Sequence, residues 1–385
     1  MLERVRAARH LPAAHCVTLE SALGRVLAED IAADRDLPPM NRSARDGFAV
    51  RAADLPGTLQ IIGEVRAGQR FTGTIGPGEA VEIMTGAPLP DGADAVIMVE
   101  HTARTGDAGV TTDRTAQAGD NFTPAGHEAR AGEIVLRRGA RIGFAEIALA
   151  AATGHASVRV YERPRVAVLT TGDEVVDIDC EPAAWQVRNS NEFSLAAQVA
   201  RAGGVPVRMP VARDTREHTR ELLEKALETD LLLLSGGVSA GKYDVVESVL
   251  ADMGAEFFFD RVRIQPGQPL VFGRVRDRFF FGLPGNPAST MVTFEVFARA
   301  AVELLSGGED TTLPILFARL GAEFRQKPGL TRFLPARVGE GGVVRPVSWR
   351  GSGDIPALAR ANAFLVTEPD RELWSEGDLI RVLMQ

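Results

Sequence analysis

Residues 231–244 read LLLLSGGVSAGKYD, an apolar run followed directly by a glycine-rich loop. Four adjacent leucines without polar alternation predict a strand buried on both faces, as strands of parallel sheets are. Val166 to Leu169 is a second run of this kind, and Val205 to Val211 is a third strand. Helical spacing between Gly or Pro boundaries predicts helices over residues 193–202, 215–228, 245–253 and 287–305. Strands that alternate with helices predict a parallel sheet covered on both faces.

The segments on either side of this α/β region follow other patterns. From residue 43 to about 122, short apolar runs are separated by Gly and Pro, which predicts a small all-β domain. After Pro314 the chain again reads as strands between glycine turns, which predicts a closing β domain. Thr18 is expected to cap a helix that continues to Leu27, and residues 141–152 are expected to form another. The expected domain boundaries are 1–45 with 125–160, 46–124, 161–306 and 307–385.

Composition narrows the possible functions. The 385 residues, 45% apolar and 24% charged, predict two or three globular domains. A net charge of −8 argues against broad nucleic-acid binding, although local groups can still hold a small anion. Cys16 and Cys180 are far apart in sequence, which is typical of a reduced compartment, and the histidines lack metal-binding spacing. No apolar run approaches the roughly 20 residues of a membrane span, and no secretory signal is evident, so a cytoplasmic protein is expected.

Three polar loops should meet at one edge of the sheet, because ligands of open parallel sheets bind beyond the carboxyl ends of the strands. The loops read TTGDE at 170–174, SGGVSAGKYD at 235–244 and GLPGNP at 282–287. Free backbone N–H groups in such loops bind anions, and the Asp173 and Glu174 carboxylates can bind a divalent cation. A single loop of this kind could be rich in glycine only because a tight turn requires it. An Asp-Glu pair is often part of a solvent-exposed turn. Three matching loops together favour a phosphate and metal site.

Other candidate motifs are ambiguous. Gly236 to Lys242 nearly matches the phosphate-binding pattern GxxxxGK[ST], but Tyr243 stands where a magnesium-binding Ser or Thr is needed, so we reject this interpretation. Asp46 precedes a glycine, and Asp-Gly is a common turn signal. Thr85 could be an ordinary residue at the end of a strand. From the residues alone, the prediction is an α/β domain with an anion and metal site, flanked by β domains.

Six motifs occur in a fixed order: Ser43 to Val50 (SARDGFAV), Met84 to Pro90 (MTGAPLP), Thr171 to Glu174 (TGDE), Asn189 to Asn191 (NSN), Ser235 to Ser239 (SGGVS) and Gly282 to Pro287 (GLPGNP). In this order they closely resemble the MoeA family of molybdopterin molybdenumtransferases, also called molybdenum insertases, which includes the C-terminal half of gephyrin. The resemblance covers nearly the whole chain. It implies a central doubly wound, mostly parallel α/β domain of the molybdopterin-binding type. It also implies an extended N-terminal α+β region, a small β domain and a C-terminal β-barrel-like domain.

The resemblance also implies a reaction. Members of the family transfer molybdenum from molybdate to adenylylated molybdopterin and release AMP, with Mg²⁺ as the usual divalent cation. It implies an L-shaped homodimer with substrates in a cleft shared between subunits, and transient contact with the adenylyltransferase and with molybdoenzyme maturation proteins. Two alternatives stay open: a molybdopterin adenylyltransferase, and a non-catalytic cofactor carrier or scaffold. The flanking β domains argue against the first. The carboxylates at Asp46, Asp173, Glu174 and Asp244 argue against the second, because a pure carrier has less need of a metal site.

Carried over motif by motif, the resemblance assigns the site residues. The catalytic positions would be Asp46, Thr85, Glu174, Asp214 and Asp244. The substrate-binding positions would be Gly236, Gly237, Ser239, Arg261, Gln265, Gln268, Pro284, Pro287 and Ser352. The metal ligands would be Asp173, Glu174 and Asp244. The first two catalytic residues lie in the small β domain and would reach across the dimer.

One segment departs from the family pattern. Where the family often reads lysine-x-x-x-lysine-Pro-Gly-lysine-Pro, residues 261–269 read RVRIQPGQP. Arg261 keeps the first charge, whereas Gln265 and Gln268 lack the other two. An amide still donates a hydrogen bond to an oxyanion, but an uncharged contact is about half as strong. We therefore expect weaker molybdate binding, or more reliance on Arg261, Arg263 and backbone N–H groups, and a gain in affinity from Gln265→Lys.

Overall fold

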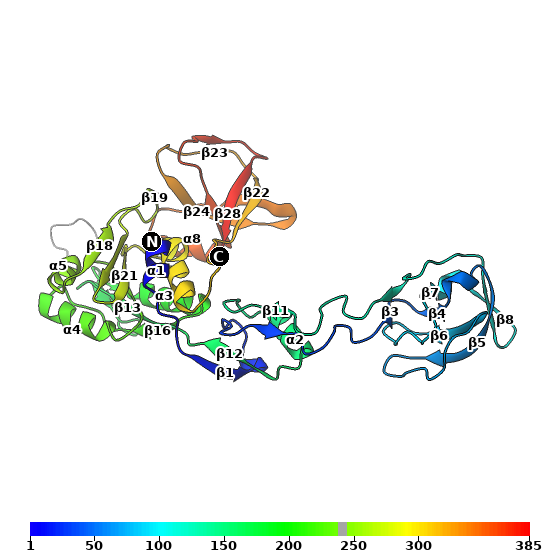
Figure 1. Ribbon diagram of the computed structural model, residues 1–385. Coiled ribbons are helices and arrows are strands. Elements are labelled where there is room, and N and C mark those ends of the chain that lie inside the picture. The colour runs from blue at the N-terminus through cyan, green and yellow to red at the C-terminus, as the bar shows by residue number, and fades with distance from the viewer. Residues whose placement is uncertain (238–244) are drawn as a thin grey trace. The chain divides into compact units, whose positions relative to one another are not determined.

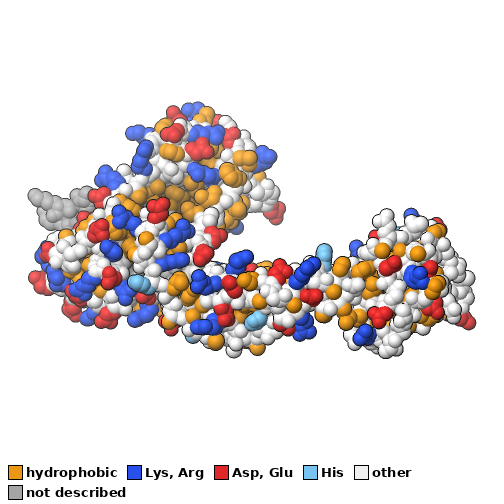
Figure 2. Space-filling model, in the orientation of Figure 1, with side chains coloured by type: hydrophobic (Ala, Val, Ile, Leu, Met, Phe, Trp, Pro, Cys, Tyr) orange, Lys and Arg blue, Asp and Glu red, His pale blue; other side chains and the backbone are white. Residues whose placement is uncertain are grey.

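The computed structural model describes residues 1–237 and 245–385. The chain forms two compact units, each described here by itself. The larger unit comprises Met1–Ala28, Gly139–Ile142 and Arg159–Gln385, and the smaller unit comprises Glu29–Arg138 and Gly143–Val158. Over the larger unit, the face shown in Figure 2 carries basic and acidic side chains intermixed. Within the described ranges, no helix is both long and apolar enough to cross a membrane.

A six-stranded sheet forms the centre of the larger unit, in the order β16-β13-β17-β21-β20-β18 (Figure 1). The first four strands are parallel, and the last two run antiparallel to their neighbours. The strands are β13 (Arg165–Thr170), β16 (Val205–Arg208), β17 (Leu231–Ser235), β18 (Glu256–Phe259), β20 (Val271–Val275) and β21 (Arg278–Leu283). All five residues of β17 are buried, which confirms the strand predicted from the leucine run.

Helices cover both faces of this sheet, as the sequence predicts. They are α1 (Leu2–Ala8), α3 (Ser190–Arg201), α4 (Arg216–Ala226), α5 (Val245–Asp252), α6 (Pro287–Thr293), η4 (Phe294–Ala298) and α7 (Arg299–Leu305). Leu231 and Leu233 pack into the core that contains α3 and α7, whereas Leu232 and Leu234 pack into the core that contains α4 and α5. The predicted helix over 287–305 is continuous, with a π-helical turn at its centre.

The C-terminal part of the larger unit is a closed barrel. Its elements are β19 (Ile264–Gln265), β22 (Ile315–Leu320), β23 (Phe324–Arg325), β24 (Thr331–Val338), η5 (Glu340–Gly342), β25 (Val343–Pro346), α8 (Ile355–Arg360), β26 (Ala363–Val366), β27 (Leu373–Trp374) and β28 (Leu379–Met384). The barrel closes because β24 pairs with both β25 and β26. β19 pairs with β24 in parallel, which joins the α/β region to the barrel. The sequence analysis missed α8, whose N-cap Asp354 accepts the N–H of Ala357.

The helix predicted from Thr18 to Leu27 is wrong. Only Leu19–Ser21 forms a single 3-10 turn (η1), and Gly24 follows with a φ of +74° that ends any helix. Val26 and Leu27 are buried in strand-like bridges to Arg141 and Val160. Long-range pairing therefore explains their apolar character. The remaining strands here are β1 (Ala14–Thr18), β12 (Ser157–Tyr161), β14 (Val175–Val176) and β15 (Val187–Arg188).

The smaller unit contains a second six-stranded sheet, in the order β7-β4-β6-β5-β9-β8, which confirms the all-β prediction for this segment. Its elements are β2 (Ile31–Ala32), β3 (Arg42–Ser43), β4 (Gly47–Val50), η2 (Ala52–Asp54), β5 (Gly57–Val65), β6 (Glu79–Ile83), β7 (Ala95–Met98), η3 (Val99–His101), β8 (Ala103–Thr105), β9 (Gly109–Thr112), β10 (Phe122–Thr123), β11 (Ile134–Leu136) and α2 (Phe144–Ala152). Gly47 has to be glycine, because a Cβ there would lie 2.0 Å from the Ile97 carbonyl oxygen.

Candidate active site

The three polar loops meet at the carboxyl ends of the parallel strands. The N–H of Thr171, after β13, donates to the carbonyl of Ser235 at 3.0 Å. The N–H of Gly236, after β17, donates to the carbonyl of Leu283 at 3.2 Å, and Thr171 also forms a bridge with Ala212 after β16. The predicted convergence of these loops on one edge is therefore confirmed.

Asp173 and Asp214 are linked at this edge, each accepting the backbone N–H of the other with its carboxylate. The N–H of Asp173 donates to Asp214 Oδ2 at 3.4 Å, and the N–H of Asp214 donates to Asp173 Oδ1 at 3.3 Å. Glu174 follows directly, and its carboxylate lies over Gly172, where a Cβ would come within 2.6 Å of it. All three acidic side chains are exposed. We call Asp173, Glu174 and Asp214 the acidic rim.

The acidic rim suits a magnesium ion that also binds substrate. Mg²⁺ usually takes one or two protein carboxylates and completes its shell with water and substrate phosphates. The adjacent, exposed oxygens of Asp173 and Asp214 fit that donor set. Over the ranges that the structure describes, no three His, Cys, Asp or Glu side chains are placed to hold one ion together. Asp244 and Ser239, predicted to bind metal and substrate respectively, lie outside the described residues.

Glycines bring the backbone of the loop after β17 close to that of the loop after β13. Gly236 and Gly237 have φ values of +87° and +61°. A Cβ on Gly236 would lie 2.9 Å from the carbonyl oxygen of Thr171, and one on Gly237 would lie 2.7 Å from its Oγ1. Only glycine fits both the conformation and the space. The structure thus places both predicted substrate-binding glycines at the edge that carries the acidic rim.

Asn191 connects two of these loops, although the sequence analysis gave it no role. From the first turn of α3, its Nδ2 donates to Ser235 Oγ at 2.9 Å and to the carbonyl of Gly285 at 2.7 Å. Its side chain is 8% exposed. The sequence signal was the motif Asn189 to Asn191, in which Asn189 caps the helix through the N–H of Glu192.

A second group of predicted residues gathers around the start of α6. Pro287 occupies the first turn of the helix, where its missing N–H needs no partner. The carbonyl of Pro284 accepts the hydroxyl of Thr290, and the carbonyl of Ser352 accepts the N–H of Ala288 at 2.9 Å. Ser352 also lines a surface hollow of about 530 Å³. The structure therefore brings Pro284, Pro287 and Ser352 together.

The segment that departs from the family pattern packs against the same helix, α6. A Cβ on Gly267 would lie 2.4 Å from the Thr293 methyl carbon, so only glycine allows this approach. Gln265 pairs with Arg332 in the β19–β24 ladder, and Arg332 Nη1 donates to Gln265 Oε1. Arg332 Nη2 donates to the carbonyl of Lys327 at 3.2 Å. A guanidinium from the barrel therefore lies beside the position where the family often has lysine.

The other predicted residues of this segment are exposed. Arg261 and Gln268 lie on the surface, and the carbonyl of Gln268 accepts the N–H of Val262 at 3.0 Å. Arg263 Nη2 donates to the carbonyl of Gly329 at 3.3 Å. These contacts fix the backbone of the loop and leave the Arg261 and Gln268 side chains at the surface.

Asp46 and Thr85 form a separate pair in the smaller unit. Asp46 Oδ1 accepts both the N–H and the hydroxyl of Thr85, each at 2.7 Å. These two hydrogen bonds stabilise the carboxylate and lower the pKa of Asp46 below its ordinary value. Both side chains are exposed. The structure thus brings together two predicted catalytic residues that are far apart in sequence.

Comparison with known proteins identifies the family. Family models match three segments of the chain: the MoeA N-terminal region (domains I and II) over residues 1–154, a probable molybdopterin-binding domain over 167–304 and the MoeA C-terminal region (domain IV) over 318–384. The molybdopterin molybdenumtransferases of Staphylococcus epidermidis RP62A and Bacillus subtilis 168 are each 34% identical over 96% of this chain. The matches cover 90% and 89% of those proteins, respectively.

Comparison with solved structures leads to the same family. Two structures of the molybdopterin biosynthesis MoeA protein of Pyrococcus horikoshii align over 100% of this chain. One has a TM-score of 0.80, 28% identity and 98% coverage of that chain; the other has a TM-score of 0.73, 33% identity and 97% coverage. The resemblance inferred from the six motifs is confirmed. The chain belongs to the MoeA family of molybdenum cofactor biosynthesis enzymes.

Proposed function

We propose that this enzyme transfers molybdenum from molybdate to adenylylated molybdopterin and releases AMP, as its relatives' name molybdopterin molybdenumtransferase suggests. The observation that carries the proposal is the edge of the sheet where the acidic rim meets the Gly236–Gly237 loop. A pyrophosphate needs N–H donors and a cation, and this edge offers backbone N–H groups and carboxylates that can hold a cation. Hydrolysis consumes one water and breaks one phosphorus–oxygen bond of the pyrophosphate. Insertion would form two molybdenum–sulfur bonds to the dithiolene, and one molybdate oxygen would leave as water with the two thiol protons, so molybdenum keeps its oxidation state.

The acidic rim and the glycine loop would contact the pyrophosphate in different ways, the rim through a bound cation and the loop through its backbone. Asp173 and Asp214 would hold Mg²⁺, with Glu174 beside them and Asp244 as a further ligand. When bound, the ion would offset the negative charge that the phosphates develop during hydrolysis. The N–H of Gly237 would donate to a phosphate oxygen, and the missing side chains of Gly236 and Gly237 would let the phosphate approach the backbone; the N–H of Gly236 already donates to the carbonyl of Leu283.

Molybdate would bind at the start of α6. The loop of Pro284 and Pro287 and the nearby Ser352 form one side of this site, and the segment from Arg261 to Gln268 forms another. The amide of Gln265 has its oxygen taken by Arg332, so its Nε2 is left to donate to an oxyanion. Arg332 supplies positive charge at the same place. This arrangement supports retained binding of molybdate without the family's lysines.

A homodimer would complete the site, with Asp46 and Thr85 contributed by the partner subunit. Mixing two inactive variants tests this idea: Asp46→Ala and Asp214→Ala each remove one half of a composite site. If the halves come from different subunits, random mixing restores about a quarter of the activity, because half of the dimers carry one intact site of two. No recovery, in a mixture shown to exchange subunits, would mean that both halves come from one chain.

The first test of the function is an AMP-release assay. Purified protein receives adenylylated molybdopterin and Mg²⁺, with and without micromolar molybdate. Release that depends on molybdate, and is lost in Asp244→Ala, supports the insertase. Tight nucleotide binding without release at any molybdate concentration would favour a carrier. Absence of binding would overturn the proposed substrate.

A further inference from the structure

The smaller unit contains a surface pocket to which the proposed reaction assigns no role. The pocket has a volume of about 300 Å³ and is lined by residues 40–41, 70–71 and 88–91. Small-molecule sites begin at about this volume. The third lining segment closely follows Thr85, whose hydroxyl donates to Asp46. The pocket and the Asp46–Thr85 pair therefore belong to the same part of this unit.

Much of the pocket lining is apolar. Met40, Phe71 and the Pro-Leu-Pro run at 88–90 supply this part of the lining. The Phe71 ring packs on two glycines, since a Cβ on Gly63 would lie 2.6 Å from the ring and one on Gly73 would lie 2.8 Å from it. The glycines thus make room for the ring. An apolar lining that includes an aromatic side chain suits a planar organic ring.

Asp91 presents a carboxylate at this pocket. Its carbonyl accepts the N–H of Ile75 at 2.8 Å, and a Cβ on Gly92 would lie 2.4 Å from the Ile75 carbonyl oxygen, so the backbone here is tightly held. Asp91 Oδ2 lies 3.9 Å from Arg70 Nη2, beyond hydrogen-bond length, and both side chains are exposed. Both carboxylate oxygens can therefore accept N–H groups of a ligand.

Asn41 presents a donor at the same pocket. Its Oδ1 accepts the N–H of Ala125 at 2.9 Å, which fixes the orientation of the amide. Its carbonyl accepts the N–H of Leu89 at 2.9 Å, which ties two lining segments together. Within residues 1–237 and 245–385, Asn41 Nδ2 has no hydrogen-bond partner, so it can donate to a ligand. The pocket thus offers a pair of acceptor atoms, a donor and an apolar surface.

A pterin ring has the matching edge. Its 2-amino group and the neighbouring ring N–H donate side by side, and a ring carbonyl follows them. A carboxylate accepts two such N–H groups together, as it does those of a guanidinium, and an amide N–H suits the carbonyl. Adenine has an amino group beside a ring nitrogen that only accepts, so a carboxylate would face a lone pair.

We propose that this pocket binds the pterin ring of the substrate, and that Asp91 recognises its amino and ring N–H groups. This inference rests on the proposed function, because the pterin is that of adenylylated molybdopterin. The pocket belongs to the same subunit as the Asp46–Thr85 pair. The acidic rim and the glycine loop would contact the pyrophosphate, and the pocket would select the ring.

Two free rings test the recognition by Asp91 in the full-length protein. Pterin is the first probe, and lumazine, which has an oxygen in place of the 2-amino group, is the second. Wild-type protein should bind pterin about tenfold more tightly than lumazine, as measured by fluorescence titration. Asp91→Asn should remove this preference by weakening pterin alone. The melting temperature and the affinity for AMP should not change, because an exposed ion pair contributes little to stability.

Asp113→Asn is the matched control. Asp113 is also exposed in the smaller unit and also lies 3.9 Å from an arginine, Arg114, but it does not line the pocket. This variant should keep the wild-type preference for pterin over lumazine. A general effect of charge on ring binding would change both variants equally and would overturn the assignment of Asp91.

AMP release connects the pocket to the substrate. Asp91→Asn should raise the concentration of adenylylated molybdopterin for half-maximal AMP release about tenfold, and Asp113→Asn should leave it unchanged. If wild-type protein releases AMP but does not prefer pterin, or if Asp91→Asn keeps the preference or the wild-type half-maximal concentration, the inference is overturned and the insertase stands. Wild-type protein that prefers pterin through Asp91 but releases no AMP would overturn the proposed function and leave the ring site.

Discussion

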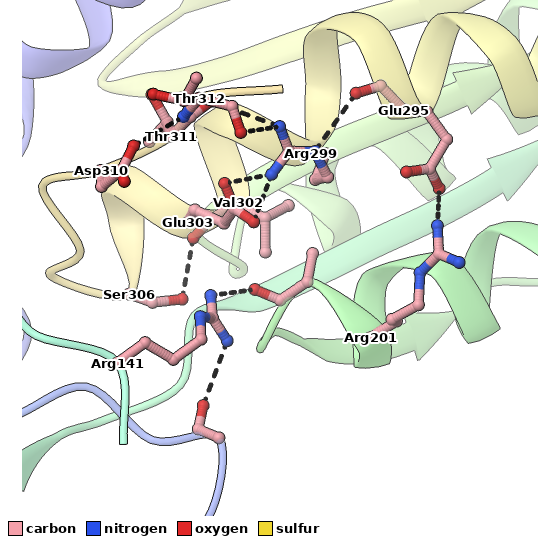
Figure 3. A network of polar contacts seen from close by, with 12 residues as sticks. Arg141, Arg201, Glu295, Arg299, Val302, Glu303, Ser306, Asp310, Thr311 and Thr312 are labelled. Carbon is pink, nitrogen blue, oxygen red and sulfur yellow. Dashed lines mark hydrogen bonds and ion pairs between the residues drawn. The ribbon is translucent and has the colours of Figure 1, made fainter. Parts of the chain in front are cut away.

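Polar side chains are paired differently in two regions, the active-site edge and the helix network in Figure 3. At the edge, the exposed carboxylates of Asp173 and Asp214 accept each other's backbone N–H groups, and buried hydroxyls lack partners. In the network, Arg299 Nη1 contacts both carboxylate oxygens of Glu303, at 2.6 and 2.7 Å, and Nη2 donates to the carbonyls of Thr311 and Thr312 (Figure 3).

Other members of the network are paired in the same way. Glu295, buried on the π-helical turn, binds Arg201 at 2.6 Å and the amide of Gln198 at 2.6 Å. Arg141 donates to the carbonyl of Ala202 at 3.0 Å and that of Gly24 at 3.2 Å. The charges of the network are paired within the fold, whereas the carboxylates of the acidic rim are exposed and available to a cation. Substitutions in the two regions should therefore separate activity from stability.

Asp214→Asn should give the largest effect. The amide keeps the shape and an oxygen acceptor for the Asp173 N–H, but it removes one negative charge from the acidic rim. We expect AMP release to fall about 100-fold and to need more Mg²⁺, while the melting temperature does not fall. The measurement is the AMP-release rate over a Mg²⁺ titration. Glu217→Gln, an exposed carboxylate in the first turn of α4, is the control; an equal loss there would contradict the assignment.

Arg332→Gln should have the next largest effect, on molybdate. Losing a charged hydrogen-bond donor should raise the molybdate concentration for half-maximal AMP release about tenfold. Gln265→Lys alone should bring no gain, contrary to the expectation from sequence, because its ammonium would meet the Arg332 guanidinium. The double variant Gln265→Lys with Arg332→Gln should recover much of the loss. Additive effects in this double-mutant cycle would mean that the two positions act independently.

Thr85→Val probes the pair in the smaller unit. Without the Thr85 hydroxyl, the pKa of Asp46 should rise toward its ordinary value, which a carboxyl ¹³C NMR titration can follow. The lowered pKa in the folded state determines how the contribution of Asp46 to stability changes with pH. The contribution of Asp46 is present above its unfolded pKa and is lost as pH falls through the folded pKa, and the variant should lose part of it. Thr85→Ser should behave like the wild type; an unmoved pKa in Thr85→Val would show that the N–H alone matters.

The sequence predicts a secondary-structure element reliably where every residue of that element is buried. The leucines of β17 lie between two cores, so the run itself reveals a buried central strand. Asp173 is predicted at this edge because it follows a parallel strand, whereas Asp214, which it meets there, is assigned only through the resemblance to the family. The helix predicted from Thr18 failed because its apolar spacing reflects bridges to Arg141 and Val160, more than 100 residues away.

The features that the sequence did not predict depend on contacts between residues that are far apart in the chain, or on elements too short to show a pattern. Arg332 lies 67 positions from Gln265, and only the β19–β24 ladder brings them together. The short helix α8 carries a proline in its first turn and too few residues for a periodic signal. Asn191 joins the loops after β17 and β21 through contacts to Ser235 and Gly285, which are 44 and 94 positions away, and no local motif reveals these contacts.

Glu303→Gln should give the smallest effect, and its sign tests the comparison. Burial raises the pKa of Glu303 despite the partly opposing Arg299. Its contribution to stability is therefore greatest below its unfolded pKa and falls as pH rises through the folded pKa. Glu221→Gln is the matched control, because the hydrogen bond from Lys225 lowers the pKa of Glu221.

Urea unfolding between pH 4 and pH 7 measures the free energy of unfolding of both variants and of the wild type. Relative to the wild type, Glu303→Gln should gain stability as pH rises, by less than about 1 kcal/mol because solvent screens part of the ion pair. Glu221→Gln should change in the opposite direction, and AMP release should be unaffected in both. Parallel pH slopes would contradict the assignment of a buried, costly charge to Glu303. A loss of AMP release in Glu303→Gln would mean that the network takes part in the chemistry, and the division between the two regions would fail.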